Sequence, residues 1–391
     1  MEKPKIRFLK NKHSWVRNTF EEIAKRRTKS SDNPDLPRVE YQDIISGEGR
    51  LNKDLNKNID CRKGIVFETN DILYGKLRPY LKNWLHPNFN GIALGDFWVL
   101  QARNCDSKFL FSLVQSPKFQ RVANDTSGTK MPRSDWKTVS QTEFSIPTSN
   151  EEQSAIGSLF RTLDDLLISY KDNLANYQSL KATMLSKMFP KAGQTIPEIR
   201  LDGFEGEWEV VNLGTLIENY DEIISGASGF PIATSSRKGL YLQNDYFEGG
   251  RTGIDLTLDF HRVPMGYVTY RHMSDDSIFK FNKNNFETDV LVSKEYPVFI
   301  SNDSSDIDFL LYHLNNSRLF LRFSTMQKLG GTRVRLYYRN LITYKLAVPT
   351  VKEQQAIGAY FSNLDQLITS YQEKITQLET LKKKLLQDMF I

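Results

Sequence analysis

The sequence predicts an α+β fold built from two similar halves, each holding one globular domain and one long helix. Three observations support this prediction. A segment of 38 residues occurs twice, apolar residues recur every seven positions within both copies, and the rest of each half holds short apolar runs typical of β-strands. We therefore expect a tandem duplication.

The repeat is clearest between residues 152–189 and 353–390. Aligned without gaps at an offset of 201, these segments are identical at 16 of 38 positions. Weaker matches extend outward: PKIRF with Trp15 recurs as PEIRL with Trp208, and a Pro-Thr pair precedes each copy. The expected segments are a first globular domain at residues 1–147, a first helix at 148–190, a second globular domain at 191–349 and a second helix at 350–391.

Both copies of the repeat are predicted to be long helices that pair with each other. Each starts with a capping pattern, Thr148-x-x-Glu151 or Thr350-x-x-Glu353. The seven-residue period over about four heptads favours a coiled-coil seam between helices roughly 60 Å long. The intervening domain is long enough to return the chain, so we expect antiparallel pairing; the alternative is that each helix packs on its own domain. The expected pairing residues are Ile156, Leu163, Tyr170, Tyr177 and Met184 in the first helix and Ile357, Leu364, Tyr371, Leu378 and Leu385 in the second.

The globular domains are expected to combine short strands with a short helix each. The β-like runs are residues 71–74, 97–100, 266–270 and 289–292, separated by turns such as Gly47-Glu48-Gly49 and Gly249-Gly250. The helices are expected near residues 109–119 and 309–323. The domains differ in sequence more than the helices do, which predicts related roles on different targets.

Composition bounds the classes of protein that this chain can represent. Its 391 residues are too many for one comfortable core, and the net charge of +5 permits a polyanionic partner without requiring one. Cys61 and Cys105 provide neither a disulfide framework nor a Cys-rich metal site. The sequence contains no signal peptide or membrane span, which predicts a cytoplasmic protein without membrane contact.

The sequence holds no pattern typical of a catalytic or metal centre. It lacks a GxxxxGK(S/T) phosphate loop and the Asp/Asn-Pro-Pro-aromatic motif of an amino-methyltransferase, and its five histidines have no metal-ligand spacing. Pro34-Asp35 with Glu40-x-Gln42 loosely resembles a metal-nuclease pattern, but Gln42 stands where that pattern needs lysine. We expect no catalytic residue, metal ligand or cofactor in this chain, and two matching halves without such groups indicate a binding protein.

Basic residues beside aromatic residues, glycines and turns are the candidate nucleic-acid contacts. Arg and Lys on loops bind phosphate, and Arg can read guanine with two hydrogen bonds. Alternation in residues 332–336 would point two arginines to one face of a strand. Each residue alone is more often a solvated charge, but the turns Gly128-Thr129-Lys130 and Gly331-Thr332-Arg333 occupy matching places. The candidates are Lys76, Arg78, Lys130, Arg133, Arg333 and Arg335.

The order of these features resembles the specificity subunit of type I restriction–modification enzymes. The resemblance spans nearly the whole chain, and only the start of the first domain departs, where FLKNKHSW stands in place of LDGFEGEW. Its strongest carriers are Glu152, Gln153, Ala155, Ile156, Gly157, Phe160, Leu163, Asp164 and Tyr170, matched by Glu353, Gln354, Ala356, Ile357, Gly358, Phe361, Leu364, Asp365 and Tyr371.

This resemblance implies two target-recognition domains, each reading half of a split DNA target, and two helices that pair as an antiparallel coiled coil and set the unread spacer. The implied partners are double-stranded DNA, two modification (methyltransferase) subunits and, for cleavage, restriction subunits. S-adenosylmethionine, ATP and Mg²⁺ are expected on those partner subunits, and adenine is the base expected to be methylated. The chain itself would have no enzymatic activity.

Three other interpretations remain open at this point. A detached recognition half of a fused restriction–methylation enzyme would share these domains. A coiled-coil scaffold with two protein-binding heads would explain the helices but not the matching basic turns, and a binding assay with and without DNA would separate it. A degenerate nuclease would need a metal site.

Overall fold

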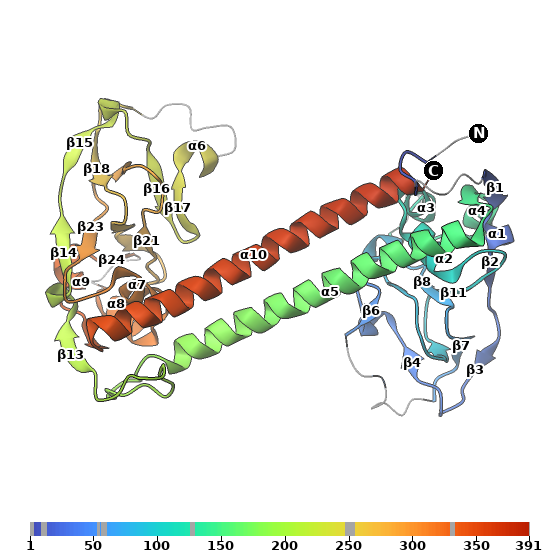
Figure 1. Cartoon of the computed structure of the whole chain (residues 1–391), viewed down its shortest axis with the longest axis horizontal. Helices are drawn as coiled ribbons and strands as arrows, with labels where there is room; N and C mark the ends of the chain where they lie inside the picture. Colours follow the sequence, from blue (N-terminus) through green and yellow to red (C-terminus); the bar gives the residue numbers. More distant parts are fainter. Residues whose placement is uncertain are drawn as a thin grey trace. The chain divides into compact units, whose positions relative to one another are not determined.

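The structure, a computed structural model, describes residues 4–8, 14–52, 55, 61–125, 130–246, 255–328 and 333–390. The chain forms two compact units: unit 1 comprises Met1–Leu174 with Ser370–Ile391, and unit 2 comprises Ala175–Thr369. Helix α5 (Asn150–Lys187) begins in unit 1 and ends in unit 2, whereas α10 (Val351–Met389) begins in unit 2 and ends in unit 1 (Figure 1). Each unit therefore holds one globular part and a piece of both long helices.

Among its described residues, unit 1 contains two four-stranded sheets, with strand orders β2-β11-β8-β9 and β3-β7-β10-β4, and the pairs β1-β12 and β5-β6. The main core packs the first sheet against the helices, and a second cluster lies between the two sheets. The strands are β1 (Trp15–Thr19), β2 (Ala24–Arg26), β3 (Ser30–Ser31), β4 (Arg38–Val39), β5 (Ile44–Ile45), β6 (Arg50–Leu51), β7 (Gly64–Phe67), β8 (Ile72–Gly75), β9 (Trp84–Leu85), β10 (Gly91–Ala93), β11 (Phe97–Ala102) and β12 (Glu143–Pro147). The helices are α1 (Phe20–Ile23), α2 (Ser107–Gln115), α3 (Pro117–Ala123), α4 (Trp136–Gln141) and the 3-10 turns η1 (Tyr41–Asp43) and η3 (Pro79–Leu81).

Unit 2 contains, in its described part, the sheets β14-β23-β19-β21 and β15-β18-β22 and the pairs β13-β25, β16-β17 and β20-β24. The strands are β13 (Glu209–Asn212), β14 (Ile217–Tyr220), β15 (Ile223–Ser225), β16 (Ala233–Ser236), β17 (Gly239–Leu242), β18 (Asp259–Val263), β19 (Val268–Tyr270), β20 (Met273–Ser274), β21 (Phe281–Lys283), β22 (Val290–Ser293), β23 (Val298–Ser301), β24 (Val334–Arg335) and β25 (Lys345–Val348). The helices are α6 (Gln243–Tyr246), α7 (Ile307–Asn316), α8 (Arg318–Met326), α9 (Tyr338–Leu341) and the 3-10 turns η4 (Leu213–Thr215) and η5 (Gly226–Ser228).

The same strand register recurs in both units. Tyr74 of β8 pairs with Trp84 of β9, and Tyr270 of β19 pairs with Phe281 of β21. Both tyrosines are buried in the main core of their unit. The β1-β12 pair of unit 1 corresponds to the β13-β25 pair of unit 2. The main sheets also have equivalent strand orders, β2-β11-β8-β9 in unit 1 and β14-β23-β19-β21 in unit 2, whereas the β5-β6 pair occurs in unit 1 and the β16-β17 hairpin in unit 2. The mixed helix and strand content expected from the sequence is confirmed.

The short helices of both domains differ from the sequence prediction. One helix was expected near residues 109–119 and another near 309–323, but each place holds two helices. In unit 1, Pro117 begins α3 and the side chain of Ser116 caps it, so the chain turns instead of continuing α2. Ser317 caps α8 in the same way and separates it from α7.

The start of α5 lies one residue later than the predicted capping pair, Thr148 with Glu151. The side chain of Ser149 accepts the hydrogen bond from the Glu152 amide (3.3 Å), while the Thr148 hydroxyl donates to a carbonyl of the segment before β1. The first copy of the repeat therefore starts its helix in the same register as the second, in which Thr350 precedes α10.

A buried glutamate near the start of each long helix holds an arginine from the segment that precedes the globular part. Glu152 accepts two hydrogen bonds from Arg7 (2.6 and 2.7 Å), and Glu353 accepts two from Arg200 (2.7 and 2.6 Å). The side chains of both glutamates are at most 1% exposed. The hydrogen bonds to Glu152 raise the pKa of Arg7 above its ordinary value. The repeated PKIRF and PEIRL segments thus attach to the repeated helices through bidentate ion pairs.

The glutamine that follows each glutamate connects three elements. Gln153 accepts a hydrogen bond from the amide of Asp106, the residue that caps α2, and donates one to the Pro147 carbonyl at the end of β12 (both 2.8 Å). Gln354 makes the equivalent contacts in unit 2 (3.0 and 2.9 Å). One side-chain amide therefore fixes the long helix to both a strand and a helix of the globular part.

Within unit 1 the two long helices run antiparallel. Asp164 of α5 forms an ion pair with Lys382 of α10 (2.5 Å), and the rings of Tyr170 and Tyr371 lie 5.2 Å apart. Residue numbers therefore increase along α5 while they decrease along α10. Both ion-pair side chains are only 13% exposed.

Unit 2 contains the counterpart of this ion pair with the roles of the helices exchanged. Lys181 of α5 pairs with Asp365 of α10, and these are the positions that align with 382 and 164 at the offset of 201. The Tyr312 hydroxyl also donates to Asp365 (2.8 Å). The duplication has thus preserved one contact between helices twice.

A phenylalanine at the end of each repeat enters the core of the unit in which its helix ends. Phe390 packs against Phe109 of α2 and Phe160 of α5, with ring centroids 5.3 and 5.7 Å away. Phe189 packs against the equivalent two rings of unit 2 (5.4 and 6.2 Å). Each core therefore contains the end of one long helix and the start of the other.

The predicted seam residues are divided between the two cores. The start of each long helix packs on the domain that precedes it, and the later residues pack against the other helix and the other core. The main core of unit 1 includes Ile156, Leu163, Tyr170, Leu378 and Leu385. That of unit 2 includes Tyr177, Met184, Ile357 and Leu364, while Tyr371 is half-buried against the ring of Tyr170.

Crosslinking tests the antiparallel pairing. After both native cysteines are replaced by serine, the double variant Asp164→Cys with Lys382→Cys should crosslink within one chain, because these side chains are in contact in unit 1. A short dithiol reagent followed by peptide mapping measures it. Asp164→Cys with Lys384→Cys is the control, because Lys384 is exposed on α10 and should react far less. Crosslinking of Asp164→Cys to Asp365→Cys instead would indicate parallel helices.

Loss of Arg200 should destabilise unit 2. Arg200→Ala leaves the Glu353 carboxylate buried without its cation, so the free energy of unfolding should fall by about 3–5 kcal/mol. Urea unfolding followed by tryptophan fluorescence measures this change. Lys191→Ala is the matched control: the Lys191 side chain is 66% exposed in its ion pair with Glu198, and its loss should cost less than about 1 kcal/mol. Equal effects of the two variants would contradict the role given to the buried pair.

Candidate nucleic-acid interface

Two basic residues of unit 2 lie on one face of β24. Arg333 and Arg335 are exposed, whereas Val334 and Leu336 between and after them are buried. This alternation agrees with the strand pattern expected from the sequence. The Tyr270 hydroxyl donates to the Leu336 carbonyl (3.0 Å), so the segment is anchored on the main core of unit 2.

The equivalent place in unit 1 brings Lys76 and Arg133 together. Arg133 forms an isolated β-bridge with Leu77, which corresponds to the pairing of Arg335 with β20. The carboxylate of Asp96 lies 2.9 Å from the Arg133 guanidinium and 3.6 Å from the Lys76 ammonium. Two of the candidates in the first domain therefore share one acidic partner.

The hydroxyl of Tyr41 forms hydrogen bonds with the backbone of this cluster. Its hydroxyl donates to the Asp96 carbonyl and accepts a hydrogen bond from the Leu77 amide (3.1 Å). Burial is the main cause that raises the pKa of Tyr41 to about 12, so the hydroxyl stays protonated at neutral pH. The protonated hydroxyl therefore bonds both the Asp96 carbonyl and the Leu77 amide, which holds the segment after β8 that carries Lys76.

The other two candidates of unit 1, Arg78 and Lys130, are exposed. Arg78 has a left-handed backbone (φ 49°, ψ 61°), as does Lys82 (φ 54°, ψ 41°), and the two flank η3 with its exposed Tyr80. Such conformations are costly for residues other than glycine and are concentrated at binding sites. Gly128, Thr129, Gly331 and Thr332 of the predicted basic turns, and the predicted turn Gly249-Gly250, lie outside the described residues.

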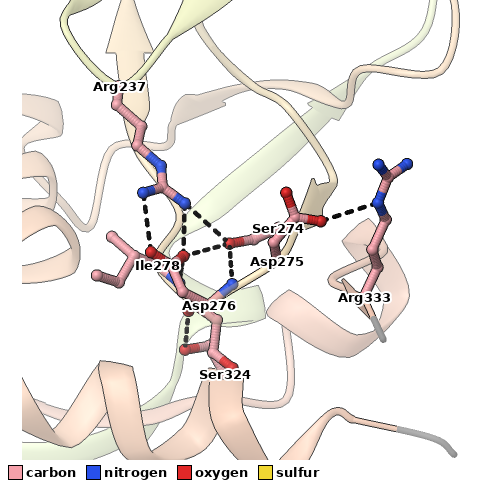
Figure 2. Close-up of polar contacts among 8 residues, drawn as sticks. Arg237, Ser274, Asp275, Asp276, Ile278, Ser324 and Arg333 are labelled. Carbon is pink, nitrogen blue, oxygen red and sulfur yellow. Dashed lines mark hydrogen bonds and ion pairs between the residues drawn. The ribbon is translucent and has the colours of Figure 1, made fainter. Parts of the chain in front are cut away.

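A group of basic residues lines a pocket of about 420 Å³ in unit 2, and Arg333 is the member of this group that was among the candidates expected from the sequence. Figure 2 shows Arg237 and Arg333 on this pocket, each directed at an aspartate of the segment that follows β20. The basic residues of its lining are Arg237, Lys238, Arg271, Lys280 and Arg333. The only local signal was an Arg-Lys-Gly turn between two short β-like runs, and nothing in the sequence joins that turn to Arg333.

The described part of the chain shows few features of a metal site, a membrane span or a reactive histidine. Among those residues, no group of three His, Cys, Asp or Glu side chains could hold a metal ion. No described helix is long and apolar enough to cross a membrane. Burial lowers the pKa of both His86 and His313 to about 4, so each is a neutral ring at pH 7, and each packs against aromatic rings.

Comparison with known proteins supports the resemblance found in the sequence. Residues 239–380 match the family described as "Type I restriction modification DNA specificity domain". The type I restriction enzyme MjaVIII specificity subunit of Methanocaldococcus jannaschii is 22% identical over 355 residues, which are 83% of this chain and 79% of the relative. The chain is similar to type I restriction–modification specificity subunits, and the resemblance found in the sequence is thus confirmed.

Two further similarities accompany this match. The EcoDI specificity subunit of Escherichia coli is 25% identical over 190 residues, which are 46% of this chain and 42% of the relative. A solved structure described as the type I restriction–modification S subunit from M. genitalium has a TM-score of 0.61 at 14% identity, and the match covers 100% of this chain and 99% of that one. The structural likeness concerns the fold.

Alanine replacements test whether the matched basic residues of the two units face DNA. The variants Arg333→Ala with Arg335→Ala and Lys130→Ala with Arg133→Ala should each bind duplex DNA more weakly. A lost phosphate contact should weaken binding to all sequences and lower the slope of log K against log salt by about 0.9, whereas a lost base contact should relax one position. Fluorescence anisotropy at several salt concentrations measures both quantities. Unchanged affinity and slope in both variants would place the DNA surface elsewhere.

Proposed function

We propose that this specificity subunit reads a bipartite DNA target, with one half-site bound by each globular part. The single observation that carries the proposal is the strand register shared by the two units, which gives Arg133 and Arg335 the same place in the fold. The units differ in added elements, the β5-β6 pair of unit 1 and the β16-β17 hairpin of unit 2, and in the residues beside these arginines. A duplicated scaffold with two different basic surfaces suits a protein that contacts two different half-sites.

The two long helices have a separate role in this proposal. They pair as an antiparallel coiled coil that sets the length of the unread spacer between the half-sites. The ion pairs of Asp164 with Lys382 and of Lys181 with Asp365 support it, because they fix the register of α10 on α5 in both units. The domains then choose bases and the helices set spacing.

The chemistry belongs to partner proteins in this proposal. The chain binds double-stranded DNA and two modification subunits, which hold S-adenosylmethionine and methylate adenine. Restriction subunits that use ATP and Mg²⁺ join the complex for cleavage, and all of these components work in the cytoplasm. The relatives described above are specificity subunits of restriction enzymes, which supports this assignment.

Domain exchange tests the division of labour. Replacing residues 201–348 with the corresponding domain of a relative should change one half of the methylated motif and leave the other half unchanged. Exchange at these boundaries keeps Arg200, Pro349 and Glu353 of the original chain. The hydrogen bonds from Arg200 to Glu353 and from Gln354 to the Pro349 carbonyl, at the start of α10, are therefore retained. Methylome sequencing of cells that carry each version with its modification subunit reads both half-sites directly.

The control for this exchange is the original chain, which should give a bipartite adenine motif in cells and no methyl transfer when purified alone. A scaffold protein would give no DNA motif in either version. Changes in both half-sites after the exchange, or a single continuous motif, would contradict the proposal.

A further inference from the structure

The β16–β17 hairpin holds two basic residues at the edge of the pocket in unit 2. Ser236 pairs with Gly239, so Arg237 and Lys238 form the two-residue connection between the strands. The buried amide of Asn282 on β21 donates to the Ser236 carbonyl (2.9 Å) and to the preceding serine hydroxyl (2.8 Å). The hairpin is therefore fixed to the main sheet of the unit close to its tip.

The guanidinium of Arg237 is held by both oxygens of one carboxylate. Its two terminal nitrogens lie 2.8 and 2.5 Å from the carboxylate oxygens of Asp276. Asp276 also accepts hydrogen bonds from the Ser274 hydroxyl (2.8 Å) and the Ile278 amide (3.2 Å), as Figure 2 shows. The plane of the guanidinium is thus set before any ligand binds.

The segment that carries Asp276 is itself anchored on two sides. Before it, β20 pairs with β24, the strand of Arg335. After it, the fully buried Ser324 of α8 donates to the Ser277 carbonyl (2.8 Å), and Ser277 has a left-handed backbone (φ 66°). The aspartate therefore cannot easily follow a moving arginine, and the pair forms a preorganised unit.

The charges around the pocket distinguish Arg237 from its neighbours. Asp276 neutralises most of the attraction that Arg237 would have for a phosphate, but it engages only part of the five N–H donors of a guanidinium. One terminal nitrogen of Arg237 also donates to the Ser274 hydroxyl (3.5 Å), and because the side chain is 57% exposed, the donors directed away from Asp276 and Ser274 are accessible. Lys238 and Arg271, by contrast, form no ion pair with another described residue, and their charge is available for the DNA backbone.

From this arrangement we propose that Arg237 reads a guanine in the half-site bound by unit 2, with Asp276 as its positioning residue and Lys238 and Arg271 contacting flanking phosphates. An arginine whose plane is fixed can donate two parallel hydrogen bonds to the O6 and N7 atoms of guanine in the major groove. The proposal rests on the DNA-recognition function proposed above and names a residue that determines its specificity.

Selection from a randomised duplex library by the full chain tests this assignment. The wild-type protein should select a motif with guanine at a particular position, and Arg237→Ala should lose the preference at that position alone. Its affinity for the selected duplex should fall roughly 5- to 150-fold, and its affinity for unrelated duplexes should stay the same. Arg237→Lys keeps the charge but cannot fill both sites on Asp276, so it should lose the preference while the salt dependence is unchanged.

Arg262→Ala is the matched control. Arg262 is also held by two acidic side chains, Asp289 and Glu222, but it does not line the pocket, so its loss should leave the selected motif unchanged. Asp276→Asn should weaken the guanine preference without abolishing binding. Circular dichroism melting verifies that each variant is folded.

Two results would overturn the assignment and leave the proposed function intact. One is an unchanged motif in Arg237→Ala. The other is an equal loss of affinity for all duplexes with a smaller salt slope, which would make Arg237 a phosphate contact. If the wild-type chain selects no motif at all, the DNA-recognition function itself is wrong, and the assignment fails with it.

Discussion

The ion pair between a repeated aspartate and a repeated lysine determines how the two long helices meet. It occurs as Asp164 with Lys382 in unit 1 and as Asp365 with Lys181 in unit 2. Burial outweighs the attraction of Lys382 and raises the pKa of Asp164 above its ordinary value, so the pair contributes little net stability. Its value lies in register, because sliding α10 along α5 by one heptad would leave the largely buried Asp164 and Lys382, and the more exposed Asp365 and Lys181, without their partners. Apolar seams alone would tolerate such a slide far better.

The ends of both long helices pack into the cores of the globular parts, so these cores depend on the register of the helices. The arginine–glutamate pairs and the Gln153 and Gln354 amides fix the start of each long helix to its own domain. Gly157 allows this close approach, because a Cβ atom there would lie 2.5 Å from the Phe109 backbone nitrogen. The terminal rings of Phe189 and Phe390 complete the cores. Residues shared by both long helices are therefore chiefly structural, and the DNA-facing candidates lie in the globular parts, whose sequences differ more.

Periodic and repeated features could be predicted from the sequence, because they need no knowledge of distant contacts. The 201-residue offset, the heptads and the strand alternation at Arg333 and Arg335 belong to this group. The break at Ser116 was missed because a serine–proline cap within an apolar run looks like one continuous helix. The partnership of Arg7 with Glu152 was also missed, since 145 residues separate them.

The candidate site shows the same division between local and distant information. Arg333 and Arg335 stand in a recognisable strand pattern, but Arg237 becomes a candidate only through Asp276, which lies 39 residues away and is brought to it by the packing of the hairpin on the main sheet. The shared acidic partner of Lys76 and Arg133 was likewise invisible, because Asp96 lies 37 residues from Arg133 and only the β-bridge between Leu77 and Arg133 brings the two basic residues together. Base-reading residues are the hardest to predict, since they belong to the globular parts, where the sequences of the two halves differ most.

The central claim is that the helices set spacing and the globular parts choose bases, and heptad insertion tests it most directly. The test adds seven residues to α5 between Tyr170 and Tyr177 and seven to α10 between Tyr371 and Leu378. Asp164 and Lys382 then both remain in unit 1, and Lys181 and Asp365 both remain in unit 2, so both ion pairs are kept. The helices lengthen by about 10 Å, which corresponds to roughly three base pairs. Methylome sequencing should then show both half-sites unchanged and a spacer longer by up to about three base pairs. Altered half-site bases with an unchanged spacer would contradict the account.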